Sequence, residues 1–392
     1  MDNFEQTEDF LKPRESAAAG NLNLLELSSD KAAEPFKIAG IDLLPHLSIS
    51  DMQSSNPDSS EKHVQDLVAQ FQPEQAERFK QYSDNFKTRS NSLGISEEEQ
   101  TKTFDSLEKL LQTSEKDGAL MSDSNRALLA VEFMYHAADP STIDQGQWNT
   151  CGASTIEERM FARFPSKVAD MVQQVALTGE WKAPDGKMIN VGDKDVLSTW
   201  MAGQHPPIDG DRTLVSQVFQ VTALNDLAQH GELDGYKGLN AHYAELNGEA
   251  MVLMEGEDQP GPFQGITSES IQRELSRLSG DADPLVLINT AKDHGANKGI
   301  IHFDSQEQFK AELERLKNAN DFPAILSVYG NQPPFNDPYS AGHVVSVSDL
   351  RQNPNGSFDV YIDNQWGKVF EGADGWYPLD QIYRSTMNAA VA

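Results

Sequence analysis

Residues 144–157 read DQGQWNTCGASTIE and contain Cys151, the single cysteine of the 392-residue chain. A polar, glycine-containing segment precedes the cysteine, and apolar residues with helical spacing follow it from Ile156 to Val175. This pattern predicts a helix whose first turn begins at Cys151. At that position the unpaired backbone N–H groups and the positive end of the helix dipole favour a thiolate. Cys151 is therefore the candidate nucleophile.

Two motifs far downstream carry the residue types that activate a cysteine. The first, PYSAGHVVSVSDL, places Gly342 and His343 directly before a strand-like run. The second, GSFDVYIDNQWG, ends another strand-like run with Asn364 and Trp366. A histidine can exchange a proton with a thiol, and an amide can hold the imidazole in one orientation.

The order and the flanking residues of these motifs resemble those of the papain-like cysteine peptidases. Gln145-Gly146 stands six residues before Cys151, as the oxyanion-hole glutamine does in that family. His343 opens a later strand, and residues 364–367, Asn-Gln-Trp-Gly, are similar to the family's Asn-Ser-Trp-Gly. The sequence differs from the family at Gly152, where a tryptophan usually follows the cysteine.

The resemblance implies a role for each matching residue. Cys151 would attack an acyl carbon, and His343 would pair with it and then protonate the leaving amine. Asn364 would orient the imidazole, and Trp366 would shield that hydrogen bond. The oxyanion would be bound by Gln145 together with the backbone N–H of Cys151. The supporting residues around these groups are Gly146, Gly342 and Trp366.

The order of elements predicts an α+β fold, because helical patterns fill the first two thirds and strand patterns the last third. By the resemblance, a helical half carrying the cysteine packs on an antiparallel sheet half carrying the histidine and asparagine, with extra helices at the N-terminus. The expected regions are a leader (1–60), a helical region (61–140) and a catalytic domain (141–392), divided into a helical half (about 141–280) and a sheet half (about 281–392).

Residues 1–60 are rich in Ser, Asn, Asp and Glu, with two short apolar clusters at 22–27 and 36–44. This composition predicts a mostly disordered leader. The alternative is a secretion leader of a bacterial effector that binds a secretion chaperone. The first residues lack the charged and apolar regions of a Sec signal peptide. We therefore expect synthesis in the cytoplasm, with export by another route if the protein is an effector.

Local signals predict several further elements. Pro73 should break or restart a helix within 61–84, and Ser96 should cap the next helix. Residues 181–192 are typical of a hairpin, whereas residues 231–264 are expected to be irregular. Residues 266–280 should form a capped helix, and four successive strand-like runs follow from residue 284 onward.

Composition excludes several classes of partner. A net charge of −30 argues against nucleic acid and against anionic membrane surfaces as partners. No apolar run is long enough to span a membrane. The nine histidines form no ligand cluster and a lone cysteine cannot build a thiolate zinc site, so we expect no metal and no organic cofactor. The expected partner is a protein or peptide substrate.

Three functions fit these residues. The first is a cysteine peptidase or related amide hydrolase. The second uses the same triad for a deamidase, transglutaminase or acyltransferase reaction. The third is a catalytically silent papain-like domain that only binds. The complete set of Cys151, His343, Asn364 and Gln145 favours an enzyme.

Overall fold

The computed structural model describes residues 59–146, 148–194, 197, 200, 205–232, 241–246, 249–254, 261–262, 265–280, 286–289, 300–337, 342–368 and 374–387. The expected leader (1–60) lies outside this part of the chain, except for Ser59 and Ser60 at the start of the first helix.

Helices dominate the first half, and most begin where the sequence supplies a cap or a proline. Ser96 is an N-cap and Pro73 occupies the first turn of its helix, as predicted. Ser122 also accepts a backbone N–H bond as the N-cap of its helix. The helices of this half are α1 (Ser59–Phe71), α2 (Pro73–Leu93), α3 (Glu97–Gln112), α4 (Asp123–Ala138), α5 (Cys151–Arg163), α6 (Pro165–Thr178) and α8 (Leu214–Gln229).

One hydrophobic core joins these helices. Side chains of α1 to α4, such as Val68, Phe104 and Phe133, share it with side chains of α5 and α8, such as Phe161 and Phe219. The helical region expected at 61–140 thus packs directly on the helix that carries the cysteine. Burial of so many large side chains is the main favourable term for this layer.

The sequence pattern suggested one long helix after Cys151, but the structure has two. The helix ends at Arg163, and a new helix starts at Pro165 after Phe164 leaves the helical conformation. Proline lacks the N–H needed inside a helix, so it is tolerated where a helix begins.

The second half contains a six-stranded sheet in the order β11-β10-β9-β8-β6-β7. Its strands are β6 (Val286–Asn289), β7 (Ile300–Phe303), β8 (Ala324–Val328), β9 (His343–Gln352), β10 (Phe358–Asp363) and β11 (Trp376–Pro378). The helices between or after them are α9 (Ser268–Ser279), α10 (Gln306–Ala319) and α11 (Leu379–Ser385). Thr267 and Ser305 are the N-caps of α9 and α10, and α9 is the capped helix expected at 266–280.

The fold is α+β, but two sequence-based expectations about its strands are wrong. The sheet is mixed, since β6 runs parallel to both β7 and β8 while the other neighbours are antiparallel. The segment 231–264, expected to be irregular, contains a three-stranded antiparallel sheet. Its strands are β3 (Ala241–Leu246), β4 (Glu249–Met254) and β5 (Gly261–Pro262). The predicted hairpin is present as β1 (Glu180–Lys182) and β2 (Met188–Asn190).

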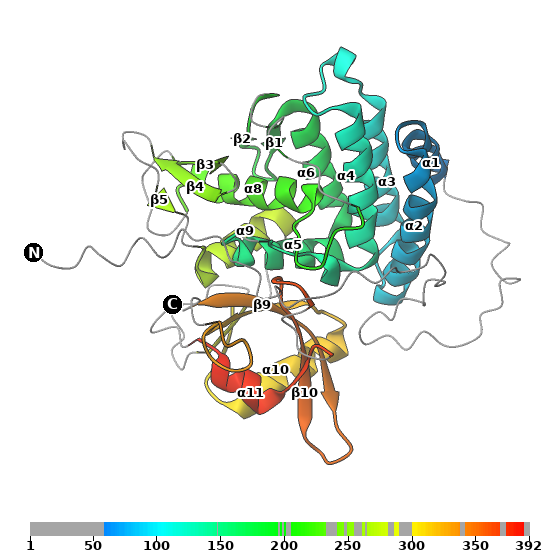
Figure 1. Ribbon diagram of the computed structural model, residues 1–392. Coiled ribbons are helices and arrows are strands. Elements are labelled where there is room, and N and C mark those ends of the chain that lie inside the picture. Colours follow the sequence, from blue (N-terminus) through cyan, green and yellow to red (C-terminus); the bar gives the residue numbers. More distant parts are fainter. Residues whose placement is uncertain are drawn as a thin grey trace, which may run out of the picture. The chain divides into compact units, whose positions relative to one another are not determined.

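Alternating side chains divide the six-stranded sheet between two cores. Val286, Ile325 and Val344 belong to the core of the helical layer, whereas the neighbouring Leu287 and Leu326 belong to a second core with α10 and α11. Helices therefore cover both faces, which explains why β8 is buried along its whole length. Figure 1 shows α5 and α9 on one face of the sheet, where α5 contacts β9 and α9 contacts β6, and α10 and α11 on the other.

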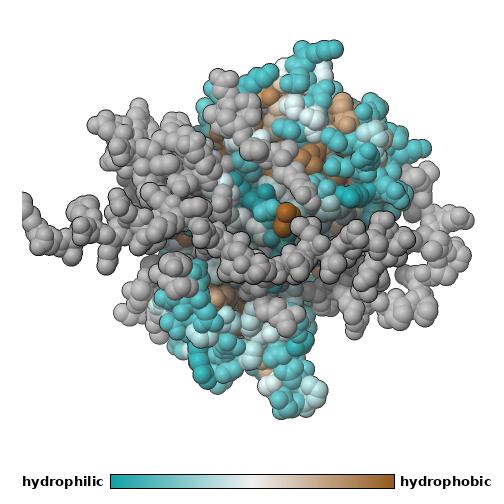
Figure 2. All heavy atoms as spheres, viewed as in Figure 1, coloured by the Kyte–Doolittle hydropathy of each residue, from teal (hydrophilic) through white to brown (hydrophobic). Residues whose placement is uncertain are grey.

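The described surface is mostly hydrophilic on the face that Figure 2 shows. Among side chains that the structure describes, the large hydrophobic ones left exposed are Met188 and Ile208. Within the same part of the chain, no helix combines the length and the apolar character that crossing a membrane requires.

Candidate active site

Cys151 is the first residue of α5, as predicted. Thr150 precedes the helix, and its hydroxyl donates to Oε1 of Gln220 on α8 at 2.8 Å, so a second helix holds the start of α5 in place. The first turn of α5 carries no acidic side chain that would oppose a thiolate. Cys151 is partly exposed as a whole residue.

Gly152 is required by packing from another part of the chain. A Cβ at this position would lie 2.5 Å from Cγ1 of Ile266 and 3.2 Å from Cδ1 of Ile271. The residues before and within α9 thus fill the space beside the start of α5. This contact explains why a large side chain such as tryptophan does not fit after Cys151.

The surroundings of the thiol oppose the expectation that the helix terminus favours a thiolate. Burial raises the pKa of Cys151 above its ordinary value, although hydrogen bonding by the backbone N–H groups of Val344, Gly152 and Cys151 lowers it in part. A nearby proton acceptor is therefore needed before the sulfur can act as a nucleophile. The Val344 contact also brings the sulfur to the residue that follows His343 on β9.

His343 and Asn364 meet because β9 and β10 are antiparallel neighbours. His343 is the first residue of β9, and Asn364 follows the last residue of β10, so both lie at the same end of the sheet. His343 Nε2 and Asn364 Oδ1 are 2.9 Å apart, and both residues are buried.

The backbone fixes the direction of this hydrogen bond. The N–H of Trp366 reaches Oδ1 of Asn364 at 3.4 Å, so the atom in that position must accept. His343 Nε2 then carries the proton and donates to Asn364. In the neutral imidazole, Nδ1 is left as the unprotonated nitrogen and is the atom able to take a proton.

Two aromatic rings enclose the imidazole. Trp366 stacks on His343 with ring centroids 3.9 Å apart and an interplanar angle of 18°. Phe335, from the segment between β8 and β9, meets the ring edge-on at 6.0 Å. These rings keep water from the His343–Asn364 bond, which strengthens it.

Gln145 is tied to the same turn of the chain. Its backbone N–H donates to the Gln365 carbonyl at 2.8 Å, and its side-chain Nε2 donates to the Trp148 carbonyl. The side chain is 5 % exposed, and its Oε1 has no hydrogen-bond partner within the described structure. Because the unsatisfied atom is an acceptor, the group that Gln145 can offer to an anionic ligand is the second N–H of its Nε2.

Three glycines lie near the candidate catalytic residues, and two of them have backbone angles or contacts that a side chain would disturb. Gly146 has a φ of +64° and is crowded by Arg212 and Trp148. Gly367 has a φ of +101°, and a Cβ there would lie 2.7 Å from the Cα of Gly210. By contrast, a Cβ at Gly342 would meet the sulfur of Met387 at an ordinary 3.4 Å.

A buried polar cluster under α5 escaped the sequence analysis. Glu132 and His136 on α4 and Glu157 on α5 are inaccessible to solvent. Burial raises the pKa of Glu132 and of Glu157 to about 8 and lowers that of His136 to about 3. Gln220 joins this cluster to Thr150, because its Nε2 donates to Glu157 at 2.9 Å. Acidic residues within a helix usually lie on its exposed face, so nothing in the local sequence indicates that these two carboxyl groups are buried.

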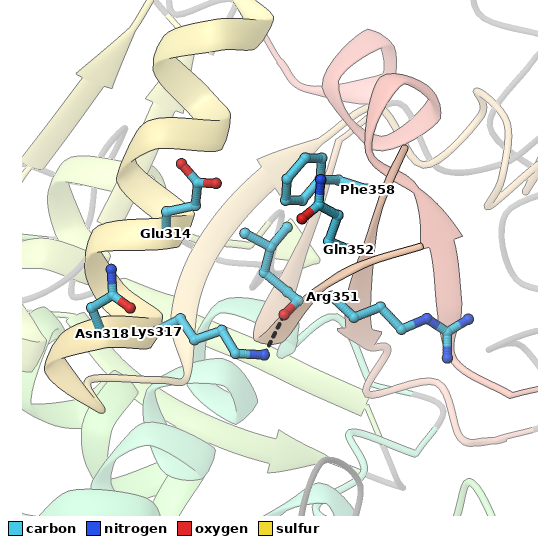
Figure 3. Close-up of a pocket in the computed structure, with 7 residues that line it drawn as sticks. Glu314, Lys317, Asn318, Arg351, Gln352 and Phe358 are labelled. Atoms are coloured by element: carbon cyan, nitrogen blue, oxygen red, sulfur yellow. Dashed lines mark hydrogen bonds between the residues drawn. The ribbon is translucent and has the colours of Figure 1, made fainter. Parts of the chain in front are cut away.

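A surface groove lies away from these residues. Figure 3 shows it between α10 and the far ends of β9 and β10, lined by Glu314, Lys317, Asn318, Leu350, Arg351, Gln352 and Phe358. Its volume is about 560 Å³. Leu350 follows His343 by seven residues on the same strand, so at about 3.3 Å per residue the groove is roughly 23 Å from the imidazole.

The structure thus brings His343, Asn364 and Trp366 together, links Gln145 to their turn, and places Cys151 against the next residue of β9. Among the described side chains, no three of His, Cys, Asp and Glu are grouped so as to bind a metal ion.

Comparisons with protein-family models, with curated proteins and with solved structures found no match to this chain.

Proposed function

We propose that the protein is a cysteine-dependent amide or peptide hydrolase whose catalytic residues have the roles known from papain-like peptidases. The observation that carries the proposal is the oriented imidazole. His343 donates through Nε2 to Asn364 at 2.9 Å under Trp366, and the N–H of the adjacent Val344 bonds to the sulfur of Cys151.

In the first half-reaction, Nδ1 of His343 takes the proton of the Cys151 thiol. The sulfur then bonds to the acyl carbon of the substrate, and the carbonyl oxygen becomes an oxyanion. The Cys151 N–H and Nε2 of Gln145 would donate to that oxygen, a contact worth about 3–4 kcal/mol in other enzymes. The C–N bond breaks as the imidazolium returns its proton to the leaving amine, and a thioester remains.

In the second half-reaction, His343 takes a proton from water, and the hydroxide attacks the thioester. The C–S bond breaks, the acid leaves, and the proton returns to the sulfur. A deamidase follows the same steps on a side-chain amide, and a transferase replaces water by an amine. All of these reactions use the same catalytic residues, so the molecule that accepts the acyl group, water or an amine, distinguishes hydrolase from transferase.

The raised pKa of Cys151 makes His343 essential at neutral pH. Without the imidazole, the thiol would ionise only above its ordinary range near pH 8.5 to 9, because burial disfavours the charged form. With the imidazole in place, proton transfer to Nδ1 provides a reactive sulfur at lower pH.

Iodoacetamide alkylation between pH 5.5 and 10.5 tests the proposal. We expect the plot of wild-type alkylation rate against pH to rise first in the neutral range (the neutral limb) and again at alkaline pH (the alkaline limb). His343→Ala should retain only the alkaline limb. A Glu77→Gln variant on the exposed side of α2 serves as a control for handling. Identical profiles for wild type and His343→Ala would show that Cys151 is a structural thiol.

The acceptor is determined separately by the product. Incubation with a glutamine peptide, with and without added amine, distinguishes peptide cleavage, a mass gain of about 1 Da from deamidation, and amine incorporation. Cleavage is the expected result, since water is the acceptor in a hydrolase.

A further inference from the structure

Gln365 occupies the second position of the Asn-x-Trp-Gly turn, between Asn364 and Trp366. Its side chain is fully buried, although it belongs to a loop and ends in a polar amide. A buried amide is costly unless its groups are bonded, so its contacts indicate what it does there.

The amide reaches α5, which carries Cys151. Nε2 of Gln365 donates to Oε2 of Glu158 at 2.9 Å, and Glu158 is itself 2 % exposed. Glu158 follows Cys151 by seven residues, two helical turns, so the two residues lie on the same face of α5. That face is also the one that contacts β9, since the Ser348 hydroxyl donates to Oε1 of Glu158 at 3.3 Å.

The same residue reaches the other parts of the site. Nε2 also lies 3.3 Å from the hydroxyl of Ser346 on β9, three residues after His343. It lies 3.2 Å from the carbonyl of Asp363, which only accepts and therefore fixes this end of the amide as the nitrogen. The backbone carbonyl of Gln365 accepts the N–H of Gln145 at 2.8 Å.

We propose that Gln365, with Glu158 as its anchor, is the positioning residue that sets the Asn364–His343 pair at its working distance from Cys151. Its side-chain Nε2 and its backbone carbonyl contact α5, β9, the last residue of β10 and the segment before α5. The inference rests on the proposed function for its catalytic meaning. Gln365 touches no reacting atom and acts through Asn364, its neighbour in the chain.

The structure provides a matched control on the same helix. Arg159, the residue after Glu158, also links α5 to the sheet half, through the Asp321 and Pro323 carbonyls at 3.0 and 2.6 Å. These two carbonyls lie in the segment just before β8, not in the Asn364 turn. If Gln365 only holds α5 against the sheet, removing Arg159 should have the same consequence as removing Gln365.

The experiment compares Gln365→Ala, Glu158→Ala, Glu158→Gln and Arg159→Ala in the full chain. The direct readout is the proton NMR signal of His343 Nε2–H, which exchanges slowly only while it is bonded to Asn364 in a buried site. The second readout is the alkylation profile of Cys151. A cooperative thermal unfolding transition will establish that each variant is folded.

We expect Gln365→Ala and Glu158→Ala to lose or broaden the Nε2–H signal and to reduce the neutral-pH alkylation rate by about tenfold or more, as small displacements of reacting groups do. The alkaline limb should remain. Glu158→Gln keeps an oxygen that can accept from Gln365 and should restore both readouts to within about threefold of wild type. Arg159→Ala should lower the unfolding temperature while leaving both readouts unchanged.

A folded Gln365→Ala variant with the wild-type Nε2–H signal would overturn the inference, as would an equal loss of signal in Arg159→Ala. If Gln365→Ala does not fold, the contrast between Glu158→Ala and Glu158→Gln decides in the same way. A wild-type protein without a His343-dependent alkylation limb would refute the proposed hydrolase, whereas the NMR comparison would still decide whether Gln365 positions the imidazole.

Discussion

Glu132 should make the folded protein less stable as pH rises, and Glu132→Gln should remove that loss. The carboxyl is buried on α4 and accepts the N–H of Val215 at 3.1 Å, while its Oε1 has no partner among the described residues. Burial raises its pKa to about 8. The folded protein therefore keeps a proton here that the unfolded chain releases near pH 4.5.

The sign follows from the proton count. Between about pH 4.5 and 8 the folded state binds more protons than the unfolded state, so the free energy of unfolding falls as pH rises through this window. At about 1.4 kcal/mol per pH unit, the loss from this one group is about 1 kcal/mol at pH 5, about 3 kcal/mol at pH 7 and about 4 kcal/mol at pH 8.

Glutamine imitates the protonated carboxyl but adds an N–H group where Oε1 has no partner, at a cost of about 1–2 kcal/mol. Glu132→Gln should thus be less stable than wild type at pH 5 and more stable by about 1–2 kcal/mol at pH 7, with the gain increasing to pH 8. Urea unfolding at pH 5, 6, 7 and 8 measures this crossover, and the exposed Glu77→Gln provides the flat reference. A variant that is less stable by a constant amount at every pH would show that Glu132 is ionised in the folded protein.

Three other substitutions test separate parts of the site. Gly152→Ala should overpack against Ile266, slow neutral-pH alkylation and destabilise the fold by about 1–3 kcal/mol. Adding Ile266→Ala should restore much of the alkylation rate and of the stability, as measured by alkylation and urea unfolding. No recovery in the double variant would refute the contact. Gly367→Ala should cost about 1–3 kcal/mol because its φ of +101° and the Gly210 backbone leave no room for a methyl group; an unchanged unfolding midpoint would contradict this. Trp366→Ala should expose the His343–Asn364 hydrogen bond and reduce the alkylation rate at neutral pH several-fold, whereas Trp366→Phe should retain more of that rate. Equal alkylation rates in wild type and Trp366→Ala would mean that the ring does not protect the bond.

Local signals in the sequence located much of the fold because they act over a few residues. Ser96, Thr267 and Ser305 are N-caps in the structure, and Cys151 begins its helix. The strand runs that begin with His343 and end before Asn364 are adjacent and antiparallel, so these two residues meet as the family resemblance implied.

Features that depend on distant residues were not predictable in this way. Gly152 is fixed by Ile266, more than a hundred residues later in the chain, and nothing near the cysteine indicates that contact. Glu132 and Glu158 look like ordinary surface residues of helices, yet both are buried because α8 and the Asn364 turn cover them. The parallel pairing of β6 with β7 and β8 likewise depends on tertiary packing, not on alternation within one strand.

The most direct test of the central claim is the capture of an acyl group on Cys151. Wild-type protein and His343→Ala are mixed with p-nitrophenyl acetate at pH 7, quenched in acid at early times and digested, and the Cys151 peptide is weighed by mass spectrometry. We expect the wild-type peptide to gain an acetyl group, about 42 Da, and then to lose it as the thioester is hydrolysed, while the His343→Ala peptide remains essentially unmodified because its thiol stays protonated. Equal acetylation of both proteins, or none in the wild type, would contradict the assignment of Cys151 and His343 as a catalytic pair.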